Sequence, residues 1–214
     1  MDGVSILILC DIGNTTFHFL MDGKHKKYSI EEQLPQFDAS VYYISVNEKA
    51  TKKLKEVCNK TIDIASFVEF QTDYVGMGMD RIIACKGYED AVIVDAGSAI
   101  TVDIMNKGKH EGGFILPGVR NFEKIYAQIS PKLDFDISVK VNLDKIPLHT
   151  QDAISYSILK AIILPIKEIV KNKKVIFTGG DGELLSLYFN NSLYKEDLIF
   201  ENMKGIIDVN NCIT

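Results

Sequence analysis

Two segments of the chain, residues 6–25 and 91–110, carry the same succession of apolar and polar positions. Each has an apolar run, then Asp-x-Gly with small hydroxyl or amide residues, then a second apolar run before Gly-Lys-His. When the segments are aligned, Asp11 falls on Asp95, and the second segment has one extra residue before its Gly-Lys-His. The pattern predicts two related strand-turn-strand units, although two hairpins with Asp-Gly turns can also look alike by chance.

Each unit is followed by a further apolar strand and a helix. Residues 41–46 predict a strand and residues 47–58 a helix, while residues 175–177 predict a strand with a helix after Gly180. Because strands alternate with helices in both halves, we expect two α/β lobes, each a mixed sheet with helices packed against it.

The border between the lobes is expected within residues 74–90. It divides the chain into an N-terminal lobe, residues 1–84, and a C-terminal lobe, residues 85–214. No Pro-, Gly- or Ser-rich linker marks this border, so a helix that begins near Met79 is expected to cross from one lobe to the other.

The composition limits the possible partners. The formal net charge of -5 offers no basic face to phosphate backbones or anionic lipids, which argues against nucleic-acid and membrane partners. The apolar stretch 154–170 is interrupted by Pro165 and charged residues, and so predicts a core helix and not a membrane span. Four scattered cysteines without metal-ligand spacing are typical of a reducing compartment. We expect a cytoplasmic protein that acts on small molecules.

The first hairpin offers groups that suit the phosphates of a nucleotide. Asp11 ends a buried strand, and Gly13 lets the backbone approach a ligand closely. Asn14, Thr15 and Thr16 can donate hydrogen bonds to phosphoryl oxygens, while Asp11 holds a hydrated Mg²⁺ that neutralises part of their charge. In the alternative interpretation, these side chains only satisfy the backbone of the turn.

The second hairpin supplies Asp95, Gly97, Ser98 and Thr101. Two such loops could hold one polyphosphate from opposite lobes, across a cleft. Phosphoryl transfer depends mainly on positioning and on electrostatic stabilisation of the moving group, so small donors and carboxylates are sufficient. The sequence therefore favours an ATP-dependent kinase with its active site between two related lobes.

Two further motifs are less specific. Gly179 and Gly180 follow an apolar strand, and their bare backbone could lie flat against an adenine or ribose, although such a turn is often only a connection. Asp80 lies near the start of a predicted helix. It is either an ordinary capping carboxylate or a catalytic base that orients the acceptor hydroxyl and takes its proton late.

Taken together, five motifs in this order resemble the type III pantothenate kinase family. They are D-I-G-N-T at 11–15, G-M-D-R at 78–81, D-A-G-S-A-I-T at 95–101, G-G-F-I-L-P-G at 112–118 and T-G-G at 178–180. Members belong to the actin, sugar kinase and Hsp70-like superfamily, so the resemblance implies two RNase H-like lobes. It also implies transfer of the ATP γ-phosphate to the 4′-hydroxyl of pantothenate, the first step of coenzyme A synthesis.

The resemblance implies a role for each matched residue. Asp80 matches the proton acceptor, Ser98 a second ATP contact, and Asp95 the ligand of K⁺ or of another monovalent cation such as NH4⁺. The first phosphate-binding element would comprise Asp11, Ile12, Gly13, Asn14, Thr15, Thr16, Phe17 and His18. The pantothenate contacts would be Tyr74, Gly78, Met79, Asp80, Arg81 and Thr150. The family is typically homodimeric, and the segment 112–118 could lie at the subunit interface.

The chain departs from the family pattern in three ways. Ile100 stands where a threonine is usual, the stretch from Tyr74 to Gly78 looks compressed, and members are commonly longer. Without the resemblance, Thr150 would be expected as a helix N-cap. Two other functions stay open: a kinase of the same superfamily for a sugar, acetate or polyphosphate acceptor, and a non-catalytic regulator that binds ATP.

Overall fold

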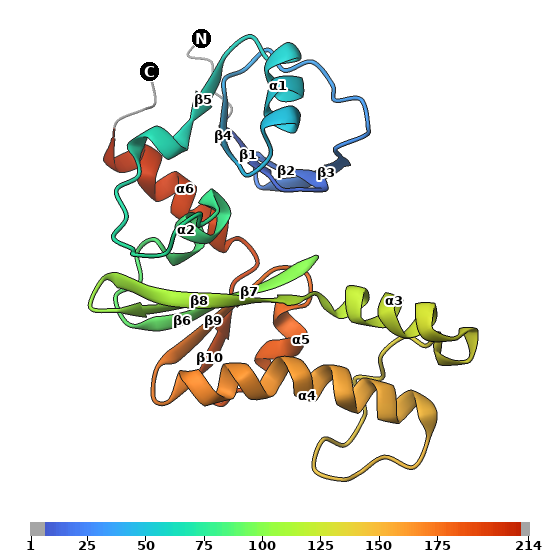
Figure 1. Cartoon of the computed structure of the whole chain (residues 1–214). Coiled ribbons are helices and arrows are strands. Elements are labelled where there is room, and N and C mark those ends of the chain that lie inside the picture. The colour runs from blue at the N-terminus through green and yellow to red at the C-terminus, as the bar shows by residue number, and fades with distance from the viewer. Residues whose placement is uncertain (1–6, 211–214) are drawn as a thin grey trace. The chain divides into compact units, whose positions relative to one another are not determined.

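The computed structural model describes residues 7–210, and its contacts divide them into two compact units. Unit 1 comprises residues 7–71, 75–87 and 197–210. Unit 2 comprises residues 72–74 and 88–196. Each unit has its own five-stranded mixed sheet, and each is described by itself (Figure 1).

Unit 1 is built on a sheet with the strand order β3-β2-β1-β4-β5. The strands β1, β2 and β3 form an antiparallel meander, and β4 and β5 continue the sheet in parallel with β1. The elements of unit 1 are β1 (Ile8–Ile12), β2 (Thr16–Met21), β3 (Lys24–Ser29), β4 (Val41–Ser45), α1 (Glu48–Glu56), β5 (Thr61–Asp63), the 3-10 helix η1 (Ile64–Phe67), α2 (Met79–Cys85) and α6 (Leu198–Val209).

Unit 2 repeats this topology, with the strand order β10-β9-β6-β7-β8. Again three strands form an antiparallel meander, and two more run parallel to its first strand. The elements of unit 2 are β6 (Ala91–Ala96), β7 (Ala99–Asn106), β8 (Lys109–Pro117), α3 (Val119–Ile129), the 3-10 helix η2 (Pro131–Leu133), α4 (Thr150–Val170), β9 (Lys174–Thr178), α5 (Gly182–Ser186) and β10 (Ser192–Tyr194).

The internal repeat predicted from the sequence is confirmed by these matching sheets, down to the second turn of each meander. That turn has positive φ at both central residues, 49° and 74° at Asp22 and Gly23, and 50° and 76° at Lys107 and Gly108. Positive φ at both positions is the requirement of a type I′ hairpin, whose twist matches that of the strands it joins. The repeat is therefore one of backbone geometry as well as of sequence.

The sheet of unit 1 buries apolar side chains on both faces, because side chains alternate along each strand. One face carries Ile12, Phe17 and Phe19 and packs with Leu54 of α1. The opposite face packs against α2 and α6, which supply Ile83, Phe200, Met203 and Ile206 to a cluster with Leu9 and Leu20.

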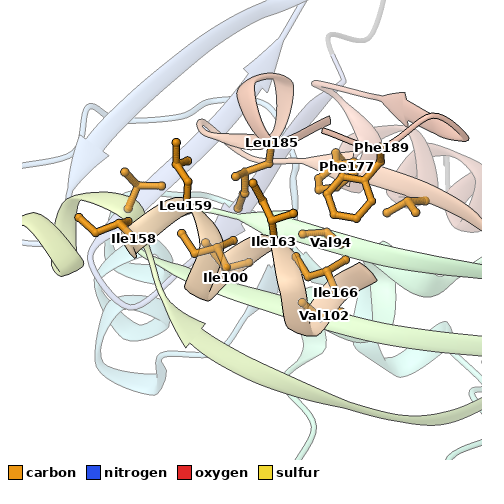
Figure 2. Close-up of a cluster of buried hydrophobic side chains, with 14 of the residues drawn as sticks. Val94, Ile100, Val102, Ile158, Leu159, Ile163, Ile166, Phe177, Leu185 and Phe189 are labelled. Carbon is orange, nitrogen blue, oxygen red and sulfur yellow. The ribbon is translucent and has the colours of Figure 1, made fainter. Parts of the chain in front are cut away.

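In unit 2 the long helix α4 covers one face of the sheet. Figure 2 shows Ile158, Leu159, Ile163 and Ile166 of α4 together with strand residues such as Val94. The prediction of a core helix over this stretch is confirmed. None of the helices within residues 7–210 combines the length and the apolar character that a membrane span requires.

The division into units differs from the sequence-based one in two respects. The helix α2 ends at Cys85 and lies wholly within unit 1, so it does not cross between the lobes. The residues of α6 fall within the predicted C-terminal lobe, residues 85–214, but the helix packs on the sheet of unit 1. The physical reason is its apolar stripe, Phe200, Met203 and Ile206, which is buried against that sheet.

Candidate active site

The first predicted phosphate-binding element is the tight turn between β1 and β2. Gly13 donates its backbone N–H to the carbonyl of Thr16 at 3.0 Å, and the exposed residues Asn14 and Thr15 form the tip. The Nδ2 of Asn47 donates to the Asn14 carbonyl at 3.5 Å, while its Oδ1 caps α1 by accepting from the Ala50 N–H at 3.0 Å. The turn therefore presents its small polar side chains to solvent from a fixed backbone.

Alternation along the strands decides which residues of this element can use their side chains. Ile12 and Phe17 are fully buried in the cluster beneath α1, so only their backbone could reach a nucleotide. Asp11 lies opposite His18 in the β1–β2 register and shares with it the face that α6 covers. Both side chains are half-buried.

His18 has neighbours that restrict its role. Its Nε2 lies 2.9 Å from Nδ1 of His25, and its ring meets that of Phe200 edge-on at 4.9 Å between centroids. Burial, followed by the positive charges of Lys27 and His25, lowers the pKa of His18 to about 4. At neutral pH His18 is therefore uncharged and provides no positive charge for a phosphate.

The proposed base, Asp80, lies in the first turn of α2, near the carboxyl end of β4. The N-cap of α2 is Gly78, not Asp80, and Oδ1 of Asp80 accepts from the Arg81 N–H at 2.8 Å. A Cβ added to Gly78 would lie 2.5 Å from Asp80 Oδ1 and 3.3 Å from Val46 Cγ1. The Val46 N–H in turn donates to the Ile12 carbonyl at 3.1 Å. Asp80 therefore lies at the same edge of the sheet as the first hairpin.

In unit 2, Asp95 is the last residue but one of β6, the place that Asp11 has in β1. It lies opposite Thr178 in the parallel β6–β9 pair, immediately before Gly179. A Cβ added to Gly179 would lie 2.5 Å from Asp95 Oδ1 and 2.6 Å from the carbonyl oxygen of Ala96. The predicted cation ligand Asp95 and the glycine motif are thus brought together. Only glycine fits at position 179, because any side chain would collide with Asp95 and Ala96.

The turn between β6 and β7 is held by Gly118, which belongs to a predicted motif, and by Asn121, which the sequence interpretation missed. The carbonyl of Ser98 accepts from the Gly118 N–H at 3.0 Å and from Nδ2 of Asn121, in α3, at 2.7 Å. A Cβ on Gly118 would collide with the Gly97 carbonyl oxygen. The final glycine of the G-G-F-I-L-P-G motif is therefore required by the turn, and Asn121 lies three residues beyond it.

Asp181 is a further ionisable group beside this turn. Its N–H donates to the Ala96 carbonyl at 3.0 Å. Burial raises the pKa of Asp181; the positive charge of Arg120 lowers it, and the negative charge of Glu123 adds to the rise. Asp181 is the N-cap residue of α5, but its side chain makes no capping hydrogen bond.

The remaining predicted substrate residues lie in different environments. Tyr74 is half-buried in unit 2, and Arg81 of unit 1 is only 5% exposed. Met79 packs against the cluster beneath α6. Thr150 is exposed and is the first residue of α4, whose N-cap is His149. The expectation that Thr150 is the N-cap is therefore wrong by one residue.

Two other expectations concern glycine and isoleucine. Gly180 has open space around its Cα, as a backbone that faces a ligand would have. Ile100 is fully buried in the apolar cluster of unit 2, so its side chain contributes to packing and not to polar contacts. That the two hairpins face one another across a shared cleft stays a prediction.

The donor sets can be compared with the cations that a kinase needs. Among residues 7–210, no three His, Cys, Asp or Glu side chains are grouped so as to hold a metal ion. Mg²⁺ usually takes one or two carboxylates and completes its shell with water and substrate phosphates, so a single Asp11 fits it. At Gly179 the Asp95 carboxylate and the Ala96 carbonyl oxygen lie close together, and both are oxygen donors of the kind that a monovalent cation takes.

Solved structures with little sequence identity to this chain have a similar fold. A 2-dehydro-3-deoxygalactonokinase structure from Sinorhizobium meliloti is similar, with a TM-score of 0.62 at 9% identity, covering 95% of this chain and 96% of that one. MreB5 of Spiroplasma citri has a TM-score of 0.52 at 11% identity, with coverages of 97% and 99%. These likenesses show the fold alone.

The sequence comparisons are more specific. The sequence model of the type III pantothenate kinase family matches residues 7–172. A type III pantothenate kinase of Campylobacter jejuni (strain RM1221) is 47% identical over 205 residues, covering 95% of this chain and 98% of the relative. The chain belongs to the type III pantothenate kinase family. It is a kinase that phosphorylates pantothenate with ATP, in coenzyme A biosynthesis.

A crystal structure from Campylobacter jejuni, described as a conserved Baf family transcriptional activator, is also similar throughout. Its TM-score is 0.85 at 44% identity, covering 97% of this chain and all of that one. The alignments cover 98% of the Campylobacter jejuni kinase and 100% of this structure. The chain is therefore about as long as these two relatives, although the stretch between Tyr74 and Gly78 looked compressed.

Proposed function

We propose that Asp80 is the proton acceptor when the γ-phosphoryl group of ATP passes to the 4′-hydroxyl of pantothenate. The observation that supports this is the position of Asp80 beside the carboxyl ends of β1 and β4, where the turn of the first hairpin also lies. A carboxylate in the first turn of a helix is stabilised in its charged form. Asp80 then orients the hydroxyl and takes its proton late, as the bond to phosphorus forms.

The phosphates of ATP are assigned to the two hairpins. In the first hairpin, Gly13 lets the backbone approach the phosphates, and Asn14, Thr15 and Thr16 donate hydrogen bonds to them. In the second hairpin, Ser98 donates such a hydrogen bond. Asp11 orients the water shell of Mg²⁺, which when bound neutralises phosphate charge. Gly179 and Gly180 leave room for the nucleoside. The exposed turn residues and the bare backbone at Gly180 support this assignment.

K⁺, or another monovalent cation such as NH4⁺, is assigned to Asp95. A monovalent cation bound there would add positive charge near the phosphate-binding turn. The closeness of the Asp95 carboxylate and the Ala96 carbonyl oxygen, which Gly179 permits, supports the assignment. Asp95 and the carbonyl of Ala96 would hold the ion.

Pantothenate is assigned to the stretch from Gly78 to Arg81, with Tyr74 and Thr150 as further contacts. We propose a homodimer, and the exposed apolar residues Ile125 and Ile129 of α3 are available for such an interface. We also propose a cytoplasmic location, which fits the free thiols of Cys10, Cys58 and Cys85; Cys212 lies outside the described residues.

The proposal is tested by offering the protein ATP, Mg²⁺ and K⁺ with a panel of small acceptors. The panel contains pantothenate, a sugar, acetate and polyphosphate, and products are detected by mass spectrometry. Phosphorylation of pantothenate alone is expected, with loss of product in Asp80→Asn. Preferred modification of another acceptor would support a different kinase of the superfamily.

A second candidate is a non-catalytic regulator that binds ATP; the Campylobacter jejuni structure is described as that of a transcriptional activator. The presence of Asp11, Asp80 and Asp95 favours the kinase. ATP binding without phosphorylation of any acceptor would favour the regulator.

A further inference from the structure

A buried polar pair lies between two strands of unit 2, and neither of its residues is assigned to ATP, to pantothenate or to a cation. Asp103 of β7 and His110 of β8 are each 1% exposed, and His110 Nε2 lies 2.8 Å from Asp103 Oδ1. Burying such groups is costly unless each finds its partners, and it is usually neutral or unfavourable compared with apolar packing. The pair therefore calls for an explanation other than stability.

The hydrogen bonds continue from this pair to a distant part of the chain. His110 Nδ1 lies 2.7 Å from Thr72 Oγ1, and Thr72 Oγ1 accepts the backbone N–H of Tyr74 at 3.0 Å. These contacts suit the tautomer in which Nε2–H donates to the Asp103 carboxylate and Nδ1 accepts the Thr72 hydroxyl. Thr72 also forms an isolated β-bridge with His110.

Only three consecutive residues of this part of the chain belong to unit 2. Residues 72–74 belong to unit 2, whereas residues 7–71 before them and 75–87 after them belong to unit 1. An ion pair between Lys109 Nζ and Asp73 Oδ2, at 2.6 Å, also links the segment to β8, but its side chains are 49% and 89% exposed. Exposed pairs contribute little, so the part-buried hydrogen bonds of Thr72 should contribute more to holding the segment.

Tyr74 is the residue that this attachment places. Its N–H is bound to Thr72, and its ring lies 6.0 Å from the ring of His110, centroid to centroid, at 58°. Tyr74 also comes four residues before Gly78, the first residue of the proposed pantothenate-binding stretch. A side chain that is already in place before the substrate arrives avoids the entropic cost of ordering it on binding.

We propose that Asp103, His110 and Thr72 are positioning residues that hold Tyr74 for pantothenate. This inference rests on the proposed function, because Tyr74 is a substrate contact only there. The three residues act through Tyr74 and do not touch substrate themselves. Their loss should therefore raise the KM for pantothenate while the KM for ATP is unchanged.

Thr72→Val is the most informative change, since it removes the hydroxyl and keeps the shape of the side chain. Loss of this hydroxyl should raise the KM for pantothenate about fivefold to tenfold, the effect of one missing hydrogen bond. Thr72→Ser, which keeps a hydroxyl, should have a KM for pantothenate close to that of the wild type. Asp73→Ala is the matched control, because it removes only the exposed ion pair next door, and its KM values should equal those of the wild type.

The steady-state measurement is made on the full chain with ATP and pantothenate varied in turn, together with thermal unfolding. A KM for pantothenate in Thr72→Val that equals that of the wild type overturns the inference. Equal losses for both substrates, in proportion to a fall in Tm, overturn it as well, because they indicate a purely structural role.

Tyr74→Ala separates failure of this inference from failure of the proposed function. If it raises the KM for pantothenate while Thr72→Val does not, Tyr74 is a substrate contact that needs no positioning by His110. If Tyr74→Ala leaves the KM unchanged, the assignment of Tyr74 in the proposed function is wrong and the inference is overturned with it.

Discussion

Replacing Gly179 by alanine should destabilise unit 2 strongly and disturb the site around Asp95. Gly179 has a φ of +83°, a region that L-residues with a side chain rarely adopt. The new methyl group would lie 2.6 Å from the Ala96 carbonyl oxygen and 2.5 Å from Asp95 Oδ1. The first of these contacts is with backbone at the end of the central strand β6, which cannot move aside cheaply.

Two contributions give the size of the effect. The left-handed conformation costs an alanine about 1 kcal/mol relative to glycine. Forcing a methyl group into the packed backbone costs about 2 kcal/mol more. For a chain of this length, a total of about 3 kcal/mol corresponds to a fall in Tm of roughly 6–12 °C.

Gly180→Ala provides the matched control at the neighbouring position. No atom lies within 4 Å of the added Cβ, and no positive φ is involved. Its stability should stay within about 0.5 kcal/mol of the wild type. Thermal unfolding and urea unfolding of both variants measure the difference. If Gly179→Ala were as stable as Gly180→Ala, the close approach of Gly179 to the Asp95 turn would be refuted.

Three further predictions follow from the site and its charges. Asp80→Asn should keep ATP binding, measured by calorimetry, but lower turnover by about 10²- to 10⁴-fold; undiminished turnover would exclude Asp80 as the proton acceptor. Asp95→Ala should abolish the response of the rate to added K⁺, and a normal K⁺ titration in the variant would contradict its role as cation ligand. The pKa of His18 is about 4 in the folded protein, below the value of about 6.5 expected in the unfolded chain. As the pH decreases from about 6.5 to about 4, the unfolded state therefore takes up a proton before the folded state does, and the free energy of unfolding should fall. Urea midpoints across this range should change less in His18→Gln, and an identical pH dependence would assign the effect to other groups.

The repeat was the most predictive feature of the sequence. Local patterns define the two meanders, because alternation of apolar residues and positive-φ turn residues are properties of short segments. Asp11 and Asp95 could be placed at equivalent strand ends for the same reason. The predicted helix over 47–58 corresponds to α1, and the capping residue Asn47 explains where it begins.

Features that depend on distant contacts could not be predicted in this way. The apolar stripe of α6 indicates a helix, but nothing in its sequence says which sheet it covers. The bridge between Thr72 and His110 joins residues 38 positions apart and involves too few residues to leave a periodic pattern. Asn121 binds a backbone carbonyl, a contact that many polar residues could make, so its position alone did not single it out.

The central claim is that Asp11 and Asp95 serve one nucleotide, with Asp80 beside the acceptor. A crystal structure with a non-hydrolysable ATP analogue, Mg²⁺ and pantothenate measures this directly. The account predicts that the turns at residues 13–16 and 97–98 both contact the same phosphate chain, with the 4′-hydroxyl within hydrogen-bonding distance of Asp80. A nucleotide that touches only one turn, or a pantothenate hydroxyl far from Asp80, would contradict it.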